Sequence, residues 1–384
     1  MLLAFGAKNF YSFKEGVEIS LEVDGNCPSH ISANNPATKL LCIKGANASG
    51  KTNIITILSF LRSFCCNSWD EKPEKKISFS SFFSNKETTA LFCKFQTDQG
   101  FTFHYETTLT EDSILTENLY KIENNKEKLL LERKGNEITN LHSSFKEFQN
   151  TKLRSNASII STGHQYEIKA IEPFYQFLNF IASNTEQFGR IEIGNNIEAL
   201  NKYYHENKDI LDQTQNFLQK VDTGIKKTEI KTRENEDGTT NYVTVFHHDT
   251  ESDVEHPLLS FHDQSSGTQV LYRTLPFYFL ILKWGGVLAL DEFEKDLHPD
   301  VLPKIIELFE SEDTNPNNAQ LIFSTHDSQT MDIMGKYRTF IVNKEKSESF
   351  GYRLDEIGGE LLRNDRPISP IYGKGKLGGV PKTT

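Results

Sequence analysis

The sequence contains no long run of apolar residues. The longest stretches, such as residues 277–282, are far shorter than the roughly 18 to 20 residues that a membrane-spanning helix needs. Residues 1–5 are apolar, but no basic segment precedes them and no cleavage site follows, so we expect no secretory signal. We therefore predict a cytoplasmic protein that does not enter a membrane.

Cysteine and net positive charge are also scarce. The five cysteines are odd in number and form no C-x-x-C pair, which argues against a disulfide framework or a zinc site. Lys and Arg number 42 against 53 Asp and Glu, for a net charge of −11. This balance argues against bulk electrostatic attraction to nucleic acid or anionic lipid, so any nucleic-acid surface must be local.

What the sequence does contain is a complete phosphate-loop motif. Residues 45–52 read Gly-Ala-Asn-Ala-Ser-Gly-Lys-Thr, which matches G-x-x-x-x-G-K-[ST]. A compact apolar strand over 39–44 precedes the motif, and an apolar-periodic helix over 54–64 follows it. In this context backbone N–H groups surround the phosphates, Lys51 bridges the β- and γ-phosphates, and Thr52 ligates Mg²⁺. The predicted ATP-binding residues of this loop are Gly45, Ala46, Asn47, Ala48, Ser49, Gly50, Lys51, Thr52 and Asn53.

A pair of carboxylates lies far along the chain from this loop. The buried-strand pattern over 287–290 ends in Asp291 and Glu292. Asp291 is placed to hold Mg²⁺ together with Thr52, and Glu292 is placed to orient the attacking water. Because the loop and the carboxylates are so distant in sequence, a large piece of chain is inserted between the two halves of one nucleotide site.

Two further features flank the carboxylates. Ser266 and Gly267 begin an apolar helix over 270–282, and a hydroxyl with free N–H groups at a helix start makes a second anion site. Residues 320–325 read as a strand that ends at His326, which can reach a γ-phosphate from the neighbouring strand. Each feature alone has an ordinary explanation, an N-cap or a loop histidine, but their order and spacing favour a nucleotide site. The predicted catalytic residues are Lys51, Glu292 and His326.

The chain around these motifs is expected to form an α/β fold. Residues 1–139 hold two opening strands, the phosphate loop and alternating segments that predict an antiparallel β subdomain. Residues 140–220 show helical patterns without the sustained heptads of a coiled coil, and we interpret them as a helical insertion. Residues 221–384 form the second half of the nucleotide-binding unit.

The ordered set of motifs resembles the ABC-type ATPase heads of the SMC, RecF and OLD families. Their loop often reads G-x-N-x-S-G-K-[ST]-N, and Asn47, Ser49 and Asn53 fit this pattern. More closely, the chain resembles the AAA family ATPases of bacterial anti-phage and abortive-infection systems, such as the RloB-associated, Septu and PARIS ATPases. This resemblance runs from residues 9–13 to the tail at 372–381. It implies an ABC/SMC-type ATPase head with an antiparallel β subdomain and an inserted helical region.

The same resemblance implies how the chain works. Two heads would sandwich two ATP molecules, each site combining the phosphate loop of one chain with Ser266 of the other. The homodimer or higher homo-oligomer would act as a sensor or scaffold that controls an operon-encoded effector, a nuclease, after a phage or nucleic-acid trigger. Thr268 departs from the transporter signature, and no glutamine clearly occupies the Q-loop position, for which Gln96 is a candidate. A RecF-like DNA-repair clamp and, less favoured, an ABC transporter ATPase subunit stay open as alternatives.

Overall fold

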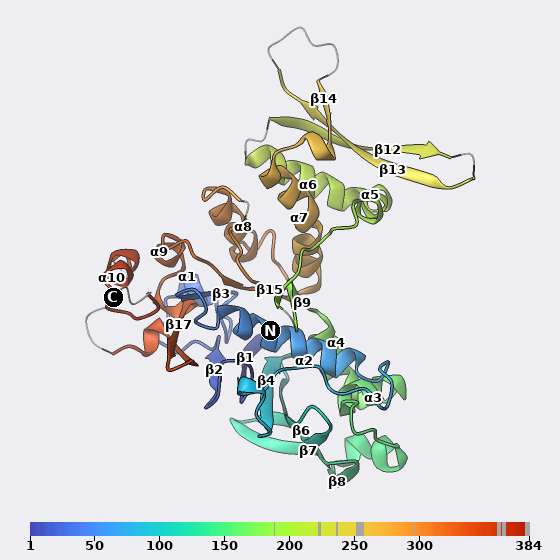
Figure 1. Ribbon diagram of the computed structural model, residues 1–384, viewed down its shortest axis with the longest axis vertical. Coiled ribbons are helices and arrows are strands. Elements are labelled where there is room, and N and C mark those ends of the chain that lie inside the picture. The colour runs from blue at the N-terminus through green and yellow to red at the C-terminus, as the bar shows by residue number, and fades with distance from the viewer. Residues whose placement is uncertain are drawn as a thin grey trace.

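The computed structural model describes the whole chain except residues 188, 222–223, 236, 251–256, 296, 359–361, 363–365 and 381–384. Two large sheets and the helices around them make up the main body, and a three-stranded sheet, β12-β13-β14, projects from the top (Figure 1). The expected α/β class is confirmed, and so is the antiparallel β subdomain. None of the described helices is both long and apolar enough to cross a membrane.

The central sheet has six strands in the order β18-β17-β3-β16-β15-β9. From β17 to β9 neighbouring strands are parallel, and only β18 is antiparallel to its neighbour. All residues of β3, β15 and β16 are buried, which explains their continuous apolar runs. The strands are β18 (Glu348–Arg353), β17 (Thr339–Glu345), β3 (Leu40–Gly45), β16 (Gln320–Ser324), β15 (Val287–Leu290) and β9 (Ile181–Ser183). Because parallel strands share an orientation, the carboxyl ends of β3, β16, β15 and β9 meet at one edge.

The second sheet is antiparallel throughout, in the order β2-β1-β4-β5-β6-β7-β8. Its strands are β2 (Val17–Ser20), β1 (Leu2–Lys8), β4 (Thr89–Gln96), β5 (Thr102–Leu109), β6 (Ile114–Glu123), β7 (Lys126–Lys134) and β8 (Glu137–Leu141). Strands β4 and β5 alternate buried and partly exposed residues, as one-sided burial requires.

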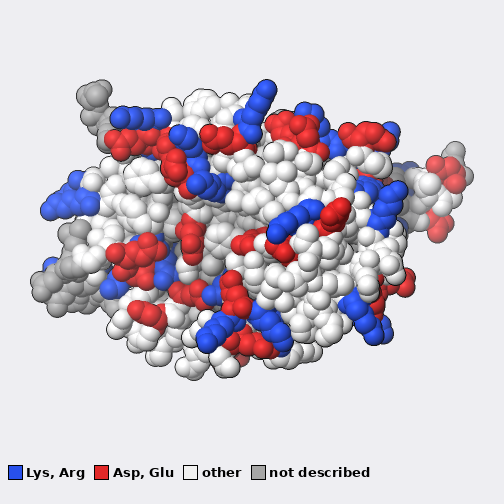
Figure 2. Space-filling view, turned by 90° about the horizontal axis from the view of Figure 1, so that it is seen from below, with Lys and Arg blue, Asp and Glu red and all other residues white. Residues whose placement is uncertain are grey.

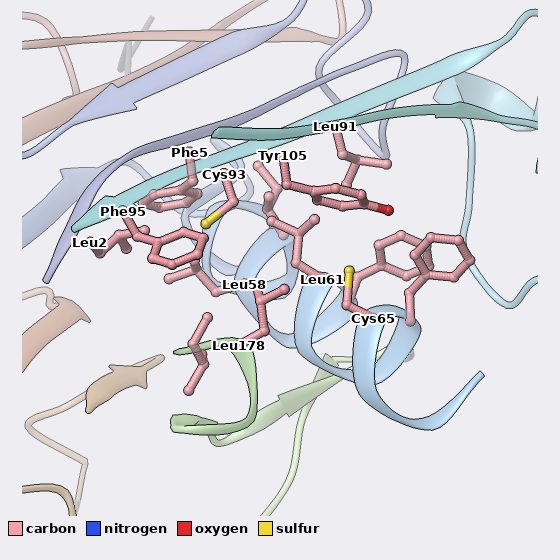
Figure 3. Close-up of a cluster of buried hydrophobic side chains, with 14 of the residues drawn as sticks. Leu2, Phe5, Leu58, Leu61, Cys65, Leu91, Cys93, Phe95, Tyr105 and Leu178 are labelled. Carbon is pink, nitrogen blue, oxygen red and sulfur yellow. The ribbon is translucent and has the colours of Figure 1, made fainter. Parts of the chain in front are cut away.

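Helix α2 (Lys51–Asn67) lies between the two sheets and begins with the last residues of the phosphate loop. Its side chains Leu58, Leu61 and Cys65 meet strand residues such as Phe5 and Cys93 in one buried cluster (Figure 3). Burial raises the pKa of the Cys93 thiol to about 12, so this cysteine is a neutral packing residue. A helix held on both faces by apolar contacts is a rigid support for the loop at its start.

Residues 140–220 contain helices, but they also supply strand β9 of the central sheet. The helices are α3 (Ile159–Gln165), α4 (Glu172–Asn179), α5 (Ile197–Glu206) and α6 (Lys208–Lys220). Helices α3 and α4 contact α2, whereas α6 contacts α7 (Ser266–Trp284). The region expected to be a helical insertion thus also contributes a strand to the core, because three residues of β9 pair with β15. A strand this short gives no readable period in the sequence.

The remaining elements complete the two ends of the molecule. They are α1 (Ser29–Ser32), β10 (Thr185–Glu186), β11 (Gly189–Arg190), β12 (Ile225–Glu234), β13 (Thr240–His248), β14 (Leu258–Ser260), α8 (Val301–Glu310), α9 (Thr330–Met334) and α10 (Ser369–Gly373). Strands β12 and β13 form an antiparallel hairpin, which projects from the upper part of the molecule (Figure 1). Seen from below, basic and acidic side chains are interspersed (Figure 2). The described residues of that face therefore form no continuous basic strip of the kind that follows a nucleic-acid backbone.

Candidate functional site

The phosphate loop joins β3 to α2 at the carboxyl edge of the central sheet, in the predicted strand–loop–helix context. Gly50 has a φ of +113°, and a Cβ there would lie 2.8 Å from Ser349 Oγ and 2.9 Å from Ser12 Oγ. Only glycine therefore fits at this turn. The Ser49 hydroxyl is buried, and no described residue forms a hydrogen bond with it. The loop thus combines a tight backbone turn with a buried polar atom that lacks a protein partner.

Lys51 is the first residue of α2 and its side chain curls back over the loop. Its Nζ donates hydrogen bonds to the carbonyl oxygens of Gly45 (3.0 Å) and Ala46 (3.1 Å). Burial lowers the pKa of Lys51, and the nearby carboxylate of Asp291 partly opposes this effect. A phosphate group would offset the cost of burying this charge better than two neutral carbonyls do.

Asn53, the last residue of the predicted loop set, contacts the β1–β2 connection. Its Nδ2 donates to Ser12 Oγ (2.7 Å), and Ser12 Oγ lies 2.7 Å from Ser349 Oγ. Ser349 Oγ in turn donates to the carbonyl oxygen of Ser49 (2.6 Å). This chain of polar contacts fixes the loop between the β1–β2 connection and β18. Neither Ser12 nor Ser349 belongs to the nucleotide motif, so the sequence did not single them out.

Asp291 follows β15 and is brought against Thr52, as its position at a strand end predicted. Thr52 Oγ1 donates to Asp291 Oδ2 (2.7 Å), and Ser324 Oγ donates to Asp291 Oδ1 (2.5 Å). The backbone of Asp291 is held on both sides by the amide of Asn184, through contacts of 2.7 and 2.9 Å. A hydroxyl and a carboxylate side by side are the oxygen ligands that Mg²⁺ uses when substrate phosphates complete its coordination.

Glu292 turns away from Asp291 toward a more open position. Its φ of +49° lies in the left-handed region, and its N–H donates to Ser324 Oγ (2.9 Å). The side chain of Glu292 is 43% exposed, and its Oε2 accepts a hydrogen bond from Arg190 Nη1 (3.1 Å). The sharp turn after β15 therefore gives the two adjacent carboxylates different neighbours, one facing Thr52 and the other facing solvent and Arg190.

His326 follows β16, the strand between β3 and β15. It therefore lies at the same edge as the phosphate loop and Asp291, next to both strands that carry them. Its side chain is exposed, and its backbone N–H donates to Glu294 (2.5 Å). His326 therefore follows the strand next to β3, from which we expect it to approach the γ-phosphate.

Ser266 and Gly267 occupy a different part of the chain. Helix α7 begins at the end of the molecule that carries β12 to β14 and runs toward β15 (Figure 1). The N-cap is Ser265, whose Oγ accepts from the N–H of Thr268 (3.2 Å), so the exposed hydroxyl of Ser266 is not used as the cap. One chain thus gathers Lys51, Thr52, Asp291 and Glu292, but it does not bring Ser266 to them.

The Q-loop candidate Gln96 is not part of this site. Gln96 ends β4 in the antiparallel sheet, where its N–H donates to the carbonyl of Met1 (2.8 Å). The neighbouring Leu2 bonds to Gln320, the first residue of β16. Gln96 therefore lies toward the amino end of β16, opposite the edge that holds Asp291. The side-chain amide that does contact Asp291 is Asn184, directly after β9.

The chain matches a family of AAA domains over residues 40–332. Its fold is similar to the SMC head domain from Thermotoga maritima, at 14% identity, with 92% of this chain and 98% of that chain covered and a TM-score of 0.42. The Smc head domain with a coiled coil and joint derived from Pyrococcus yayanosii is 10% identical, with 98% of this chain and 99% of that chain covered and a TM-score of 0.46. A third similar structure is cbiO1 from Clostridium perfringens, part of an ABC transporter complex. It is 11% identical, with 92% of this chain and 89% of that chain covered and a TM-score of 0.34.

No curated protein matches the chain. The match to the family model includes the phosphate loop, both carboxylates and His326, and it spans more than half of the 384 residues. The chain therefore belongs to the family described as AAA domain, putative AbiEii toxin, Type IV TA system.

Proposed function

We propose that this protein binds ATP with Mg²⁺ at the carboxyl edge of the central sheet and hydrolyses it to ADP and phosphate. The observation that carries this proposal is the 2.7 Å contact between Thr52 Oγ1 and Asp291 Oδ2, which joins the two halves of the motif set. The buried, unpartnered hydroxyl of Ser49 and the glycine-only turn at Gly50 fit a phosphate in the loop.

Each residue of the site has a separate role in this proposal. Lys51 exchanges its bonds to the loop carbonyls for phosphate oxygens, and Thr52 and Asp291 hold Mg²⁺. When bound, Mg²⁺ neutralises negative charge on the phosphates. Glu292 accepts a proton from the water whose oxygen attacks the terminal phosphorus, while the bond from that phosphorus to the ADP oxygen breaks. His326 contacts the transferred phosphoryl group from the end of β16.

We further propose that the working unit is a head-to-tail dimer in which Ser266 acts on the partner's nucleotide. The exposed hydroxyl of Ser266 at the start of α7, remote from the phosphate loop of its own chain, supports this arrangement. The first N–H groups of a 19-residue helix also carry positive potential toward an anion. ATP would then join two heads, and hydrolysis would release them.

Mixing two inactive variants tests the dimer. In each dimer of Ser266→Arg with Lys51→Ala, one site would contain an intact Lys51 and an intact Ser266. Random exchange makes half of the dimers mixed, each with one competent site of two, so we expect roughly a quarter of wild-type ATPase activity to return. Phosphate release after subunit exchange measures it. The double variant Lys51→Ala/Ser266→Arg mixed with Lys51→Ala forms no competent site and is the matched control. Activity no higher than that of either variant alone contradicts a composite site.

For the biological role, we propose that the dimer is a sensor or scaffold that controls an operon-encoded effector, a nuclease, in anti-phage defence. The family description, which names a putative AbiEii toxin of a Type IV TA system, supports this setting. The segment with α5 and α6 is the proposed effector surface, because Tyr204 Oη donates to the carbonyl of Tyr272 on α7 (2.8 Å). If α7 moves when two heads close on ATP, this contact would transmit the movement to α5 and α6.

Retention of the effector should depend on nucleotide state, because ATP can change partner affinity only if the two states make different contacts. We expect the product of the neighbouring gene to co-purify with the wild type and to be retained differently with ATP and with ADP. Pull-downs with each nucleotide, and with Glu292→Gln in ATP, measure this dependence. Equal retention in all three states contradicts the switch. Absence of a partner, together with salt-sensitive binding to gapped duplex DNA, would favour a RecF-like clamp instead.

A further inference from the structure

Arg190 forms a contact with Glu292 that the nucleotide motif does not require. Its Nη1 donates to Glu292 Oε2 at 3.1 Å, and no hydrogen bond joins Glu292 Oε1 to a described residue. A small cavity of about 50 Å³ adjoins the pair and is lined by Asn184, Arg190, Asp291 and Glu292, among others. A cavity of this size with polar walls can hold water. One carboxylate oxygen is thus anchored, and the other is free to meet a water molecule.

The element that carries Arg190 is braced against helix α2. Strands β10 and β11 form a two-residue ladder directly after Asn184. Ser59 Oγ of α2 donates to the carbonyl of Thr185 (2.6 Å), and Tyr11 Oη donates to the carbonyl of Gln187 (2.7 Å). The position of Arg190 is therefore set by the same helix that begins with Lys51 and Thr52.

The Arg190–Glu292 pair is poorly explained as a stabilising salt bridge. The side chains are 24% and 43% exposed, and a partly solvated pair of this kind contributes little to folding. Arg190 Nε is also buried, and no described residue bonds to it. A buried donor without a partner costs stability. What distinguishes the pair is its geometry, because Arg190 holds one oxygen of the carboxylate that directly follows Asp291.

We propose that Arg190 is a positioning residue for the hydrolysis step. It anchors Oε2 of Glu292 so that Oε1 faces the attacking water, and the β10–β11 ladder makes this orientation depend on the placement of α2. The inference rests on the proposed ATPase function. It adds a contact that couples the phosphate-loop helix to the carboxylate that receives the proton.

Replacing Arg190 with Gln should lower kcat by about 10- to 100-fold, the scale expected when a reacting group is misplaced by about 1 Å. ATP affinity should stay within about threefold of wild type, because Lys51, Thr52 and Asp291 keep their contacts. Arg190→Lys, which retains the charge, should recover part of the loss. Arg273→Gln is the matched control: Arg273 lines the same cavity, is 22% exposed and pairs with Glu192 rather than Glu292. We expect its kcat within about twofold of wild type.

A double variant separates positioning from a structural effect. If Arg190 acts through Glu292, Arg190→Gln added to Glu292→Gln should reduce the residual turnover by less than about twofold. An additive loss, an unchanged kcat in Arg190→Gln, or an equal loss in Arg273→Gln overturns the inference. A faster Arg190→Gln enzyme overturns it as well, because the contact would then be inhibitory. If the wild type hydrolyses no ATP, the proposed function itself fails; a wild type that needs Glu292 but not Arg190 contradicts only the positioning role.

Discussion

Lys51→Ala should lose ATP binding. The side chain enters the loop at the start of α2 and donates to the carbonyls of Gly45 and Ala46, and in the proposed site it exchanges these bonds for the β- and γ-phosphates. Removing one partner of a buried charge pair costs about 2 to 5 kcal/mol. We therefore expect the Kd for ATP to rise by at least about 30-fold. Calorimetric titration with ATP and Mg²⁺ measures the change.

A second buried lysine provides the matched control for this experiment. Lys39 lies just before β3, next to its amino end, 5% exposed, and burial lowers its pKa as it does for Lys51. Lys39 differs from Lys51 in position, because Lys39 precedes β3 whereas the phosphate loop follows the carboxyl end of β3. Lys39→Ala should therefore keep ATP affinity within about threefold of wild type, given a native circular dichroism spectrum. Equal affinities in Lys51→Ala and wild type would contradict the assignment of the loop.

The contiguous part of the site could be predicted because its residues are fixed by one local motif. The order strand, loop and helix around Lys51 follows from apolar periodicity and the two glycines, and the structure has that order. The approach of Asp291 to Thr52 was also foreseeable, since residues after parallel strands gather at one edge. What the sequence could not show is the strand order, in which β16 separates β3 from β15. That order depends on how the crossover segments pack.

The missed residues share a physical reason: they belong to elements too short to have a period. Asn184 lies between β9 and β10, Arg190 ends β11, and these strands have only two or three residues each. The N-cap of α7 was ambiguous in another way. Ser265 and Ser266 are adjacent and chemically identical, and only the structure shows that Ser265 caps the helix. The hydroxyl of Ser266 is therefore not needed for the cap, and Ser266 is exposed, as a role in a partner's site requires.

Glu292→Gln should separate binding from chemistry. The substitution leaves Lys51, Thr52 and Asp291 untouched, so ATP affinity should stay within about threefold of wild type. The amide oxygen of Gln can still accept the hydrogen bond from Arg190, so the side chain keeps its anchor but can no longer take a proton from water. Loss of a general base of this kind lowers turnover by about 10² to 10⁴. Phosphate release and ATP affinity should be measured on the same preparation.

Glu192→Gln is the matched control for Glu292→Gln, and the comparison decides what the carboxylate does. Glu192 lines the same small cavity and pairs with Arg273 at 3.5 Å, so its substitution also removes one acidic partner of an arginine beside the site. We expect it to change turnover by less than about twofold. Because the two variants lose the same charge, a defect confined to Glu292→Gln assigns the effect to proton acceptance rather than to the electrostatics of the cavity. Full turnover in Glu292→Gln would remove the general-base role. Equal defects in both variants would show instead that the acidic lining of the cavity matters as a whole.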